Sequence, residues 1–437
     1  MGIRSICVLG LGYIGLPTAT TLAAHGVSVL GVDVSPRVLQ TLDSGDIHIK
    51  EQGLRQAYLS ARESGNFQIA AQPAEADAFL IAVPTPFYED KSGEYQGHVH
   101  KLADMRAVVA AAESIVPFLR KGNLVLLEST SPPRTTVDVV APILRRSGLK
   151  PGRDFHLAYS PERVLPGQIL RELTENARIV GGLTPESARA AADVYAIFVS
   201  GEIIQTDSTT AELVKLMENS YRDTNIAIAN EFSRLADRFG VDIWEAISLA
   251  NRHPRVRILS PGPGVGGHCI GVDPWFLVEA APDLTPLIGA AREVNDSQPQ
   301  YVVDLMRRTL GPLQGKRIAA LGLAYKSNVD DIRESPAAEV VRLLGKAGAR
   351  VRAWEPNRPD AGIPGVEMAA NLEAALSEAE IIVLLVAHGE FVALKPRDVL
   401  SLTSARAVVD AVNGWNAAEW REAGFRVVRL GGVNTKS

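Results

Sequence analysis

A glycine-rich segment near the start of the chain constrains the fold more than any other part of the sequence. In VLGLGYIGLPTATTLAAHGVSVLGVDV, Gly10, Gly12 and Gly15 follow an apolar strand pattern and open a helical one. Gly10 permits a tight turn, Gly12 lets a pyrophosphate approach the backbone, and Gly15 lets the helix lie close to the sheet. This order of strand, turn and helix predicts a parallel, doubly wound α/β sheet that binds a dinucleotide.

The acidic residue at the end of the next strand indicates which dinucleotide to expect. Asp33 lies 21 residues after Gly12, where a carboxylate accepts hydrogen bonds from an adenosine ribose and repels a 2′-phosphate. NAD is therefore predicted, with NADP as the alternative because Arg37 could pair with such a phosphate. Tyr13 and Ile14, between the glycines, are also expected to contact the cofactor. A tight turn without any ligand is the other interpretation of the glycines.

Two later strand ends carry polar residues and prolines. Pro84 and Thr85 belong to VPTP, and Thr130 belongs to ESTSPP, each after an apolar run. Ligands of doubly wound sheets bind beyond the carboxyl ends of the strands. These three residues are therefore predicted to contact the cofactor, and ordinary loops bounded by proline are the alternative.

The pattern of strands and helices divides the chain into three parts. Apolar strand patterns alternate with helical patterns from SICVLG to ARIVGG, which is typical of a parallel sheet covered on both faces. Residues 208–239 follow one long helical period, and the alternation resumes after residue 299. We expect two Rossmann-like, doubly wound parallel-sheet domains joined by a central helical segment. The predicted bounds are 1–205, 206–300 and 301–437.

Charge and hydropathy exclude two classes of partner. The 45 basic and 50 acidic residues give a net charge of −5, without a basic block for nucleic acid. The longest apolar runs, such as 381–387, fall far short of the roughly 20 residues that cross a bilayer. The N-terminus lacks a signal-peptide pattern, and two cysteines form no disulfide framework. We expect a cytoplasmic protein that binds neither nucleic acid nor membrane.

A thiol lies in a second glycine-rich segment, PGPGVGGHCIGVDP. The glycines around Cys269 let backbone amides converge on a substrate, and the adjacent His268 favours the reactive thiolate. Because no second cysteine or histidine pair has metal-ligand spacing, we expect no metal. Asp273 lies four residues further on, so a helix that began at Cys269 would put both side chains on one face. Cys7, inside the first strand, is expected to be a buried apolar residue.

Three polar residues share one face of the long predicted helix. Glu212, Lys215 and Asn219 follow an i, i+3, i+7 pattern, for which a solvated stripe is the alternative. A thiolate can capture an aldehyde as a thiohemiacetal, and hydride loss to NAD then gives a thioester that water opens to an acid. Lysine and asparagine donors would stabilise the oxyanions, and an aspartate would orient or deprotonate water.

A set of motifs in a fixed order leads to a known family. The chain closely resembles the nucleotide-sugar 6-dehydrogenases of the UDP-glucose/GDP-mannose dehydrogenase family over nearly its whole length. This resemblance implies oxidation of a sugar's C6 alcohol to a carboxylate with two NAD, and a C-terminal domain that binds the UDP moiety. The motifs are the N-terminal glycine fingerprint, VPTP, ESTSPPRTT, YSPERVLPG, AELVKLMENSYR, GGHCIGVDP and GLAYKSNVDDIRESPA.

The resemblance also implies catalytic roles residue by residue. Cys269 matches the nucleophile of the family. Lys215, Asn219 and Asp273 match the partners that stabilise the oxyanions and handle water. These are the roles that the chemistry of the four residue types also favours.

Further matches concern water and the sugar nucleotide. Thr130 and Glu162 resemble residues that hold the catalytic water and assist proton transfer. Arg255 resembles an arginine that reaches across a homodimer interface into the partner's substrate site. Without the resemblance, Lys326 and Arg333 would read as surface charges after a strand. The implied substrate contacts are Glu162, Arg163, Val164, Lys215, Asn219, Arg222, Arg255, Gly266, Lys326 and Arg333.

Departures from the sequence of the glucose-specific members narrow the choice of sugar in the expected substrate. Those enzymes usually carry NPEFLAEG and GGSCFPKD, whereas this chain has SPERVLPG and GGHCIGVD, with Pro166 in place of a glutamate and Val272 in place of a lysine. These forms, with Trp275 after them, resemble the branch that oxidises UDP-N-acetylhexosamines. N-acetylmannosamine is the first expectation, and N-acetylglucosamine or glucose is the alternative.

Two other functions fit parts of the pattern. A two-electron dehydrogenase would use Lys215 as its base and Cys269 for packing only. A noncatalytic sensor would use both α/β domains to bind NAD or a nucleotide sugar. The occurrence of Cys269, Lys215, Asn219 and Asp273 in one chain argues against the sensor, whereas the turnover of Cys269→Ser would decide the two-electron alternative.

Overall fold

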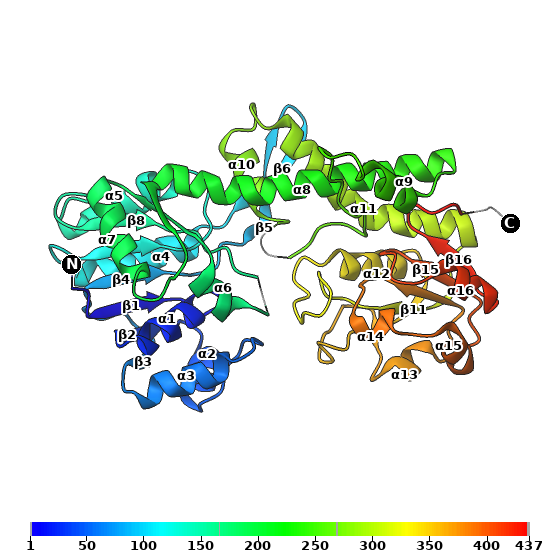
Figure 1. Cartoon of the computed structure of the whole chain (residues 1–437), viewed down its shortest axis with the longest axis horizontal. Helices are drawn as coiled ribbons and strands as arrows, with labels where there is room; N and C mark the ends of the chain where they lie inside the picture. Colours follow the sequence, from blue (N-terminus) through cyan, green and yellow to red (C-terminus); the bar gives the residue numbers. More distant parts are fainter. Residues whose placement is uncertain (1, 166, 268–269, 435–437) are drawn as a thin grey trace. The chain divides into compact units, whose positions relative to one another are not determined.

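The chain folds into two compact α/β units in a computed structural model that describes residues 2–165, 167–267 and 270–434 (Figure 1). The first unit comprises Met1–Glu218 and Trp275–Asp283, and the second comprises Asn219–Pro274 and Leu284–Ser437. Each unit contains a doubly wound sheet, so the predicted fold class is confirmed. The predicted long helix is confirmed as α8 (Ser208–Phe239).

The first unit is built on an eight-stranded sheet in the order β10-β9-β8-β7-β4-β1-β2-β3. The predicted parallel sheet has one antiparallel pair, because β9 runs antiparallel to β8. A buried strand reads as the same apolar run in either direction, so the sequence carries no signal for this reversal. The strands are β1 (Ser5–Leu9), β2 (Ser28–Val32), β3 (Phe67–Ala70), β4 (Ala78–Ile81), β7 (Leu124–Leu127), β8 (His156–Tyr159), β9 (Arg178–Gly182) and β10 (Ile203–Asp207).

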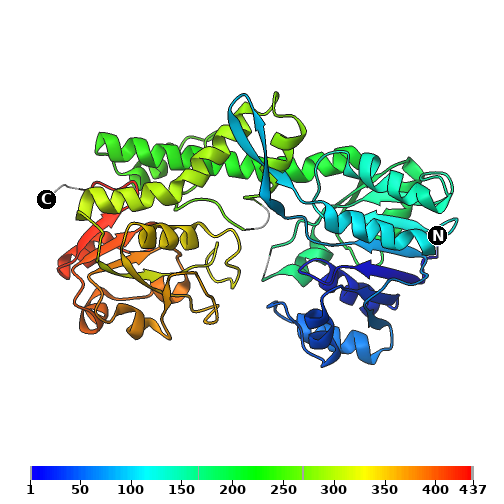
Figure 2. The same ribbon diagram turned by 180° about the vertical axis from the view of Figure 1, so that it is seen from behind.

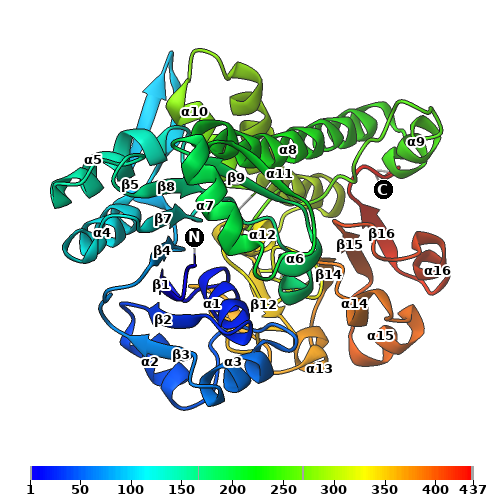
Figure 3. The ribbon, with the colours of Figure 1, turned by 60° about the vertical axis from the view of Figure 1, so that its left-hand side comes forward.

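Helices cover both faces of this sheet. In β1, Ile6 and Val8 contribute to the core under α1, whereas Cys7 and Leu9 contribute to the core under α4, as the two-residue period of a strand requires. Figures 1 and 3 show α1 and α3 on one side of the strands and α4 and α5 on the other. The helices are α1 (Gly15–Ala24), α2 (Pro36–Asp43), α3 (Leu54–Glu63), α4 (Arg106–Ile115), α5 (Ala141–Leu144), α6 (Ile169–Glu175), α7 (Pro185–Tyr195) and α10 (Asp273–Ala280), with short 3₁₀ turns at Val116–Phe118 and Arg145–Ser147 and a π-turn at Thr136–Val140.

An antiparallel hairpin in the first unit was not anticipated from the sequence. Strands β5 (Phe87–Tyr95) and β6 (His98–Ala103) pair only with each other. The hairpin packs beside α10 (Figure 2): the Ala103 amide donates to the Glu279 carboxylate at 2.8 Å, and the Phe87 ring meets Phe276 edge-on. Its strand residues are largely polar and exposed, so no apolar period predicts them.

The second unit is built on a six-stranded parallel sheet in the order β13-β12-β11-β14-β15-β16. Ile318 and Ala319 are neighbours in β11 and contribute to opposite cores, so this sheet is also buried on both faces. Its elements are α9 (Ile243–Ala250), α11 (Pro286–Leu310), β11 (Arg317–Leu321), α12 (Pro336–Lys346), β12 (Arg350–Trp354), β13 (Glu367–Met368), α13 (Leu372–Leu376), β14 (Ile381–Leu384), α14 (Gly389–Val392), α15 (Pro396–Leu402), β15 (Ala407–Asp410), α16 (Ala417–Glu422) and β16 (Arg426–Arg429).

The turns that follow β1 and β11 have the same local structure in the two sheets. Gly10 follows β1 with φ 91°, and Gly322 follows β11 with φ 90°. The next amide donates to a carboxylate that ends the neighbouring strand, Asp33 at 2.9 Å in the first unit and Glu355 at 2.7 Å in the second. In the second unit the buried His388 ring also contacts the Glu355 carboxylate at 3.0 Å.

The helix expected to begin at Cys269 begins later. Helix α10 begins at Asp273, and residues 270–272 form a turn before it. Pro274 explains the difference: in a helix that began at residue 269 it would be an interior proline, which lacks the amide for an i→i−4 bond and collides with the preceding turn. The described residues between Cys269 and Asp273 are therefore not part of α10. Among the described residues, no helix has the length and apolarity that a membrane crossing requires.

Candidate active site

Five adjacent strands of the first sheet end at the same edge and carry the predicted residues of this unit. In spatial order they are β2, β1, β4, β7 and β8, which pair in parallel. Because parallel strands share their carboxyl edge, the structure brings together residues far apart in sequence. The strands are followed by Asp33, by Gly10 to Gly15, by Pro84 and Thr85, by Thr130, and by Glu162, respectively.

The glycine turn at this edge is shaped for a dinucleotide. A Cβ on Gly12 would meet nothing within 4 Å, so the backbone there is open to a ligand. A Cβ on Gly15 would lie 1.8 Å from the carbonyl oxygen of Gly10, so Gly15 serves helix packing. The Asp33 carboxylate accepts from the amides of Leu11 at 2.9 Å and Ser35 at 2.8 Å. These residues fit a pyrophosphate at the start of α1 and a ribose at the acid.

The other predicted cofactor contacts border this turn or its neighbouring strand ends. Tyr13 and Ile14 are half-buried at the start of α1, and Arg37 is exposed. The Thr85 hydroxyl donates to the backbone carbonyl of Thr130 at 2.7 Å, which ties the end of β4 to the end of β7. Pro84 is exposed beside this bond.

The SPER segment after β8 is held by charged contacts. Glu162 is 8% exposed, and its carboxylate accepts from the Arg178 guanidinium at 2.5 Å and from the Arg163 amide at 2.7 Å. The Arg163 side chain pairs with Glu218 at 2.9 Å and donates to the backbone carbonyl of Ala177. Arg163 therefore anchors the segment, and the half-buried Val164 follows it.

The polar face of α8 contains an anchor and a buried amine. Glu212 is fully buried and accepts from the Thr136 hydroxyl at 2.6 Å and amide at 2.8 Å. Burial raises the pKa of Glu212, and the bonds from Thr136 oppose this effect. Lys215, one turn later, is 7% exposed and has no hydrogen-bond or ion-pair partner among the residues that the structure describes. The alternative of a solvated stripe does not apply to these two side chains.

Two predicted partners of the thiol meet in the second unit. The Asn219 amide donates to the Asp273 carboxylate at 2.5 Å, and Asp273 is 1% exposed. They are 54 positions apart in the sequence. Cys269 and His268 lie outside the described residues, as does Pro166. Arg222 and Arg255 are exposed.

The glycines before Cys269 have a packing role that sequence reasoning missed. A Cβ on Gly266 would lie 2.3 Å from the carbonyl oxygen of Glu334, and one on Gly267 would lie 2.8 Å from the Tyr325 ring. The loop that contains Lys326 and Arg333 is thus packed directly against this glycine segment. Within that loop both cations are exposed, and the Arg333 guanidinium pairs with Asp331 at 2.7 Å. Side chains are excluded at these glycines because two loops touch there.

Sequence reasoning also missed two acidic anchors behind the SPER segment. The Glu51 carboxylate accepts from the amides of Gly167 at 2.7 Å and Ile169 at 2.9 Å. Glu128, the first residue of the EST motif, pairs with Arg178 at 2.9 Å. No local pattern marks a charged residue as buried, so neither contact could be read from the sequence. Among the described residues, no group of three or more His, Cys, Asp or Glu side chains is arranged to hold a metal ion.

Comparisons with known proteins decide the family. Residues 4–199 match the NAD binding domain of the UDP-glucose/GDP-mannose dehydrogenase family, residues 209–297 match its central domain, and residues 319–417 match its UDP binding domain. The chain belongs to this family. As a UDP-glucose/GDP-mannose dehydrogenase family member it is an NAD-dependent oxidoreductase with a UDP-binding C-terminal domain, which confirms the predicted cofactor and enzyme class.

Similar family members act on N-acetylated sugars according to their names. The chain is 48% identical to an NDP-N-acetyl-D-galactosaminuronic acid dehydrogenase of Ralstonia solanacearum, over 95% of this chain and 97% of that protein. It is 44% identical to a UDP-N-acetyl-D-mannosamine dehydrogenase of Methanococcus maripaludis, over 98% and 97%. The solved UDP-D-ManNAc dehydrogenase of Pyrococcus horikoshii is 36% identical, with a TM-score of 0.89 over 99% of this chain and 100% of that one.

The same substitution at two glycines of the turn is expected to have opposite effects. Gly15→Ala forces a methyl group against the Gly10 carbonyl and should lower the free energy of unfolding by at least about 1–3 kcal/mol. Gly12→Ala has room in the free protein and should leave stability unchanged while it weakens NAD binding about tenfold or more. Thermal unfolding and NAD titration by fluorescence measure both. Equal stability loss in the two variants would contradict this assignment of the glycines.

The two cysteines are expected to differ in reactivity. Cys7 is fully buried in β1, and burial raises the pKa of its thiol to about 11. At pH 8 roughly one Cys7 thiol in a thousand is ionised, and alkylating reagents react with thiolates. The native protein should therefore take up one equivalent of iodoacetamide, and Cys269→Ser should take up none. Mass spectrometry that finds Cys7 labelled before unfolding would contradict this expectation.

Proposed function

We propose that the chain oxidises the C6 alcohol of UDP-N-acetyl-D-mannosamine to the carboxylate of UDP-N-acetyl-D-mannosaminuronate in two steps. The observation that supports this most is the 2.5 Å bond between Asn219 and Asp273. It joins the polar face of α8 to the first residue of α10, four positions after Cys269. An acid next to the cysteine segment suits the hydrolysis of a thioester, a step that a two-electron dehydrogenase does not have.

The proposed reaction assigns the covalent work to Cys269. The glycine turn, with Gly10, Gly12 and Gly15, would hold NAD, and two NAD in succession would supply the hydride acceptors for the two oxidations. The Cys269 thiolate attacks the aldehyde carbon that the first oxidation leaves, forming a thiohemiacetal. After the second oxidation this carbon is held as a thioester, which water opens to the acid and the free thiol. Two NADH are formed for each sugar.

The remaining residues stabilise charge and handle protons. Lys215, a buried amine, would stabilise the alkoxide of the first step and the thiohemiacetal oxyanion of the second. Asn219 would donate to the same oxygen, because its amide is oriented by Asp273. Asp273 and Glu162 are acidic groups with little exposure, suited to orienting or deprotonating the water that opens the thioester. Thr130 would hold that water through its hydroxyl.

The identity of the sugar is inferred from relatives. UDP-N-acetyl-D-mannosamine is the substrate named for the relatives from Methanococcus, Methanocaldococcus and Yersinia. The names of the Ralstonia relatives specify an N-acetylgalactosamine acid instead, which makes that sugar a second candidate. Both are N-acetylhexosamines, as the GGHCIGVD segment predicts. N-acetylglucosamine and glucose are the alternatives from the sequence, and a cytoplasmic location belongs to this proposal.

We also propose that the enzyme is a homodimer, with Arg255 donated across the interface. Tyr221, Ile228, Phe232, Leu235 and Phe239 lie along one face of α8 at intervals of three, four and seven residues. All five are exposed in the single chain, Tyr221 at 74% and Phe239 at 72%. A contiguous apolar face of this kind marks a protein interface. A second copy of α8 is the occupant that fits its length.

The number of NADH formed per sugar tests the reaction. Limiting UDP-N-acetyl-D-mannosamine should give two NADH per sugar, with lower kcat/KM for the N-acetylgalactosamine, N-acetylglucosamine and glucose nucleotides. Absorbance at 340 nm and product mass measure the stoichiometry and the acid. One NADH per sugar would support the two-electron alternative, and none with any of the four sugars would support the sensor. Cys269→Ser should lose acid formation by at least about 1000-fold while it still binds NAD.

A charge placed on the apolar face tests the dimer. Leu235→Glu should raise the dissociation constant of the dimer by about 100-fold or more, because the interface would bury an unpaired carboxylate. Lys121→Glu adds the same side chain to an exposed turn outside α8 and should leave the dimer intact. Light scattering during size-exclusion chromatography gives both masses. A monomeric native protein, or equal dissociation of the two variants, would contradict the proposed interface.

A further inference from the structure

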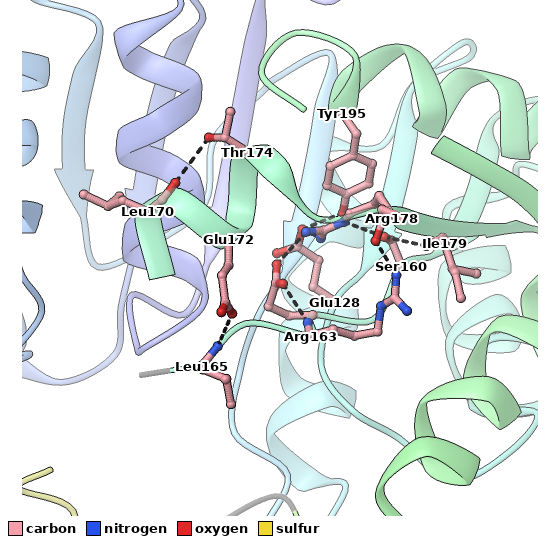
Figure 4. Close-up of polar contacts among 12 residues, drawn as sticks. Glu128, Ser160, Arg163, Leu165, Leu170, Glu172, Thr174, Arg178, Ile179 and Tyr195 are labelled. Carbon is pink, nitrogen blue, oxygen red and sulfur yellow. Dashed lines mark hydrogen bonds and ion pairs between the residues drawn. The ribbon is translucent and has the colours of Figure 1, made fainter. Parts of the chain in front are cut away.

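A buried charge cluster lies behind the SPER segment, and Glu162 is the only one of its members to which the proposed reaction gives a role. Figure 4 shows Glu128, Arg178 and Tyr195, which come from the end of β7, the start of β9 and the end of α7. The side chains of Arg178 and Glu128 are 5% and 0% exposed, and that of Glu162 is 7% exposed. Two carboxylates and one guanidinium therefore share a region that excludes water.

The guanidinium of Arg178 is held on every side. Nη1 donates to Glu162 Oε2 at 2.5 Å, Nη2 donates to Glu128 Oε1 at 2.9 Å, and Nε donates to Ser160 Oγ at 3.0 Å. The central carbon lies 4.0 Å above the Tyr195 ring. A planar, forked donor with these contacts has one orientation, which lysine could not reproduce.

Glu162 is oriented by this fixed guanidinium. Its Oε2 accepts from Arg178, and its Oε1 accepts from the amide of Arg163 at 2.7 Å. The second bond is local and joins neighbouring residues, so it cannot by itself fix the carboxylate relative to the sheet. Arg178 supplies the only ion pair that the described residues make with Glu162.

Glu128 and Tyr195 support Arg178 from behind. The Tyr195 hydroxyl donates to Glu128 Oε1 at 2.5 Å. Burial raises the pKa of Glu128 to about 7, although the charge of Arg178 opposes this effect. Tyr195 and Arg178 both donate to Oε1 of Glu128, so this carboxylate holds the guanidinium independently of its bond to Glu162.

The reversal of β9 makes this arrangement possible. Because β9 runs antiparallel to β8, with Tyr159 opposite Gly181, its first residue Arg178 lies at the carboxyl end of β8. In a parallel β9 that residue would lie at the opposite edge of the sheet. The reversed strand β9 thus places Arg178 at the edge of the sheet where the candidate site lies.

We propose that Arg178 is a positioning residue for the oxidation, which holds the Glu162 carboxylate in its working orientation and supplies its counter-charge. This inference rests on the proposed function, in which Glu162 handles the water or a proton. A buried ion cluster is a poor source of stability, since replacing one with apolar residues is often neutral. Glu128 alone would pair Arg178 for structural purposes, so the second bond to Glu162 is the feature to explain.

A double-mutant cycle between Arg178 and Glu162 tests the proposal. Arg178→Met should lower the rate of NADH formation by about 100-fold, the cost expected for a group misplaced by about 1 Å. Arg178→Lys keeps the charge without the fork and should lose roughly tenfold. In a Glu162→Gln background, Arg178→Met should cost no more than about threefold, because the group it positions is already altered. Tyr195→Phe, the matched control, keeps the bond to Glu162 and should change the rate by less than about threefold.

Each outcome has a distinct meaning. Rates are measured well below the melting temperature of every variant, and NAD affinity is measured in parallel and should stay within about twofold. If Arg178→Met costs the same factor in both backgrounds, or if Arg178→Lys is as slow as Arg178→Met, the residue is only structural and the inference is wrong. If Glu162→Gln keeps the native rate, the role of Glu162 in the proposed function fails instead. Should Arg178→Met fail to fold, the cycle is run with Arg178→Lys.

Discussion

A carboxylate at the end of the second strand of each sheet satisfies the backbone amide that follows the first strand, and the rest of each unit depends on this bond. Asp33 holds the turn at Gly10, and Glu355 holds the turn at Gly322. With the turn fixed, the following segment leaves the sheet at a set angle, and the neighbouring strands stay in register. The carboxyl edge of the sheet then becomes a defined surface on which Thr85, Thr130 and Glu162 are arranged.

Much of this fold follows from the sequence because the relevant signals are local. The glycine turn and the apolar runs of the central strands predict a doubly wound sheet, and the period of residues 208–239 predicts α8. Features that depend on contacts between segments far apart in the sequence could not be predicted. The direction of β9 depends on its pairing with β8, and the hairpin of β5 and β6 depends on its contacts with α10. The start of α10 could have been foreseen from Pro274.

The residue types of the candidate site could be predicted from the sequence, whereas the residues that hold them in place could not. Residue types and family resemblance together select Lys215, Asn219 and Asp273, and the bond between the last two agrees with that choice. Arg178 is one arginine among many in the sequence, and its pairing with Glu128 and Glu162 is visible only in the structure. The glycines before Cys269 illustrate the converse problem. Their absence of side chains suggests room for a ligand, whereas the structure shows two of them packed against another loop.

The contact between His388 and Glu355 is a difference between the two similar α/β sheets. Asp33 and Glu355 follow the second strand of their sheets in the same way, but the Glu355 carboxylate is also paired with the buried His388 ring. His388 is itself fixed, since its Nδ1 accepts from the Asn328 amide at 2.9 Å and so leaves the proton on Nε2. An enzyme that handles NAD and a UDP-sugar must sort two nucleoside diphosphates of similar charge. The two equivalent carboxylates thus differ in their partners, because Glu355 is paired with His388 whereas Asp33 accepts from the backbone amides of Leu11 and Ser35.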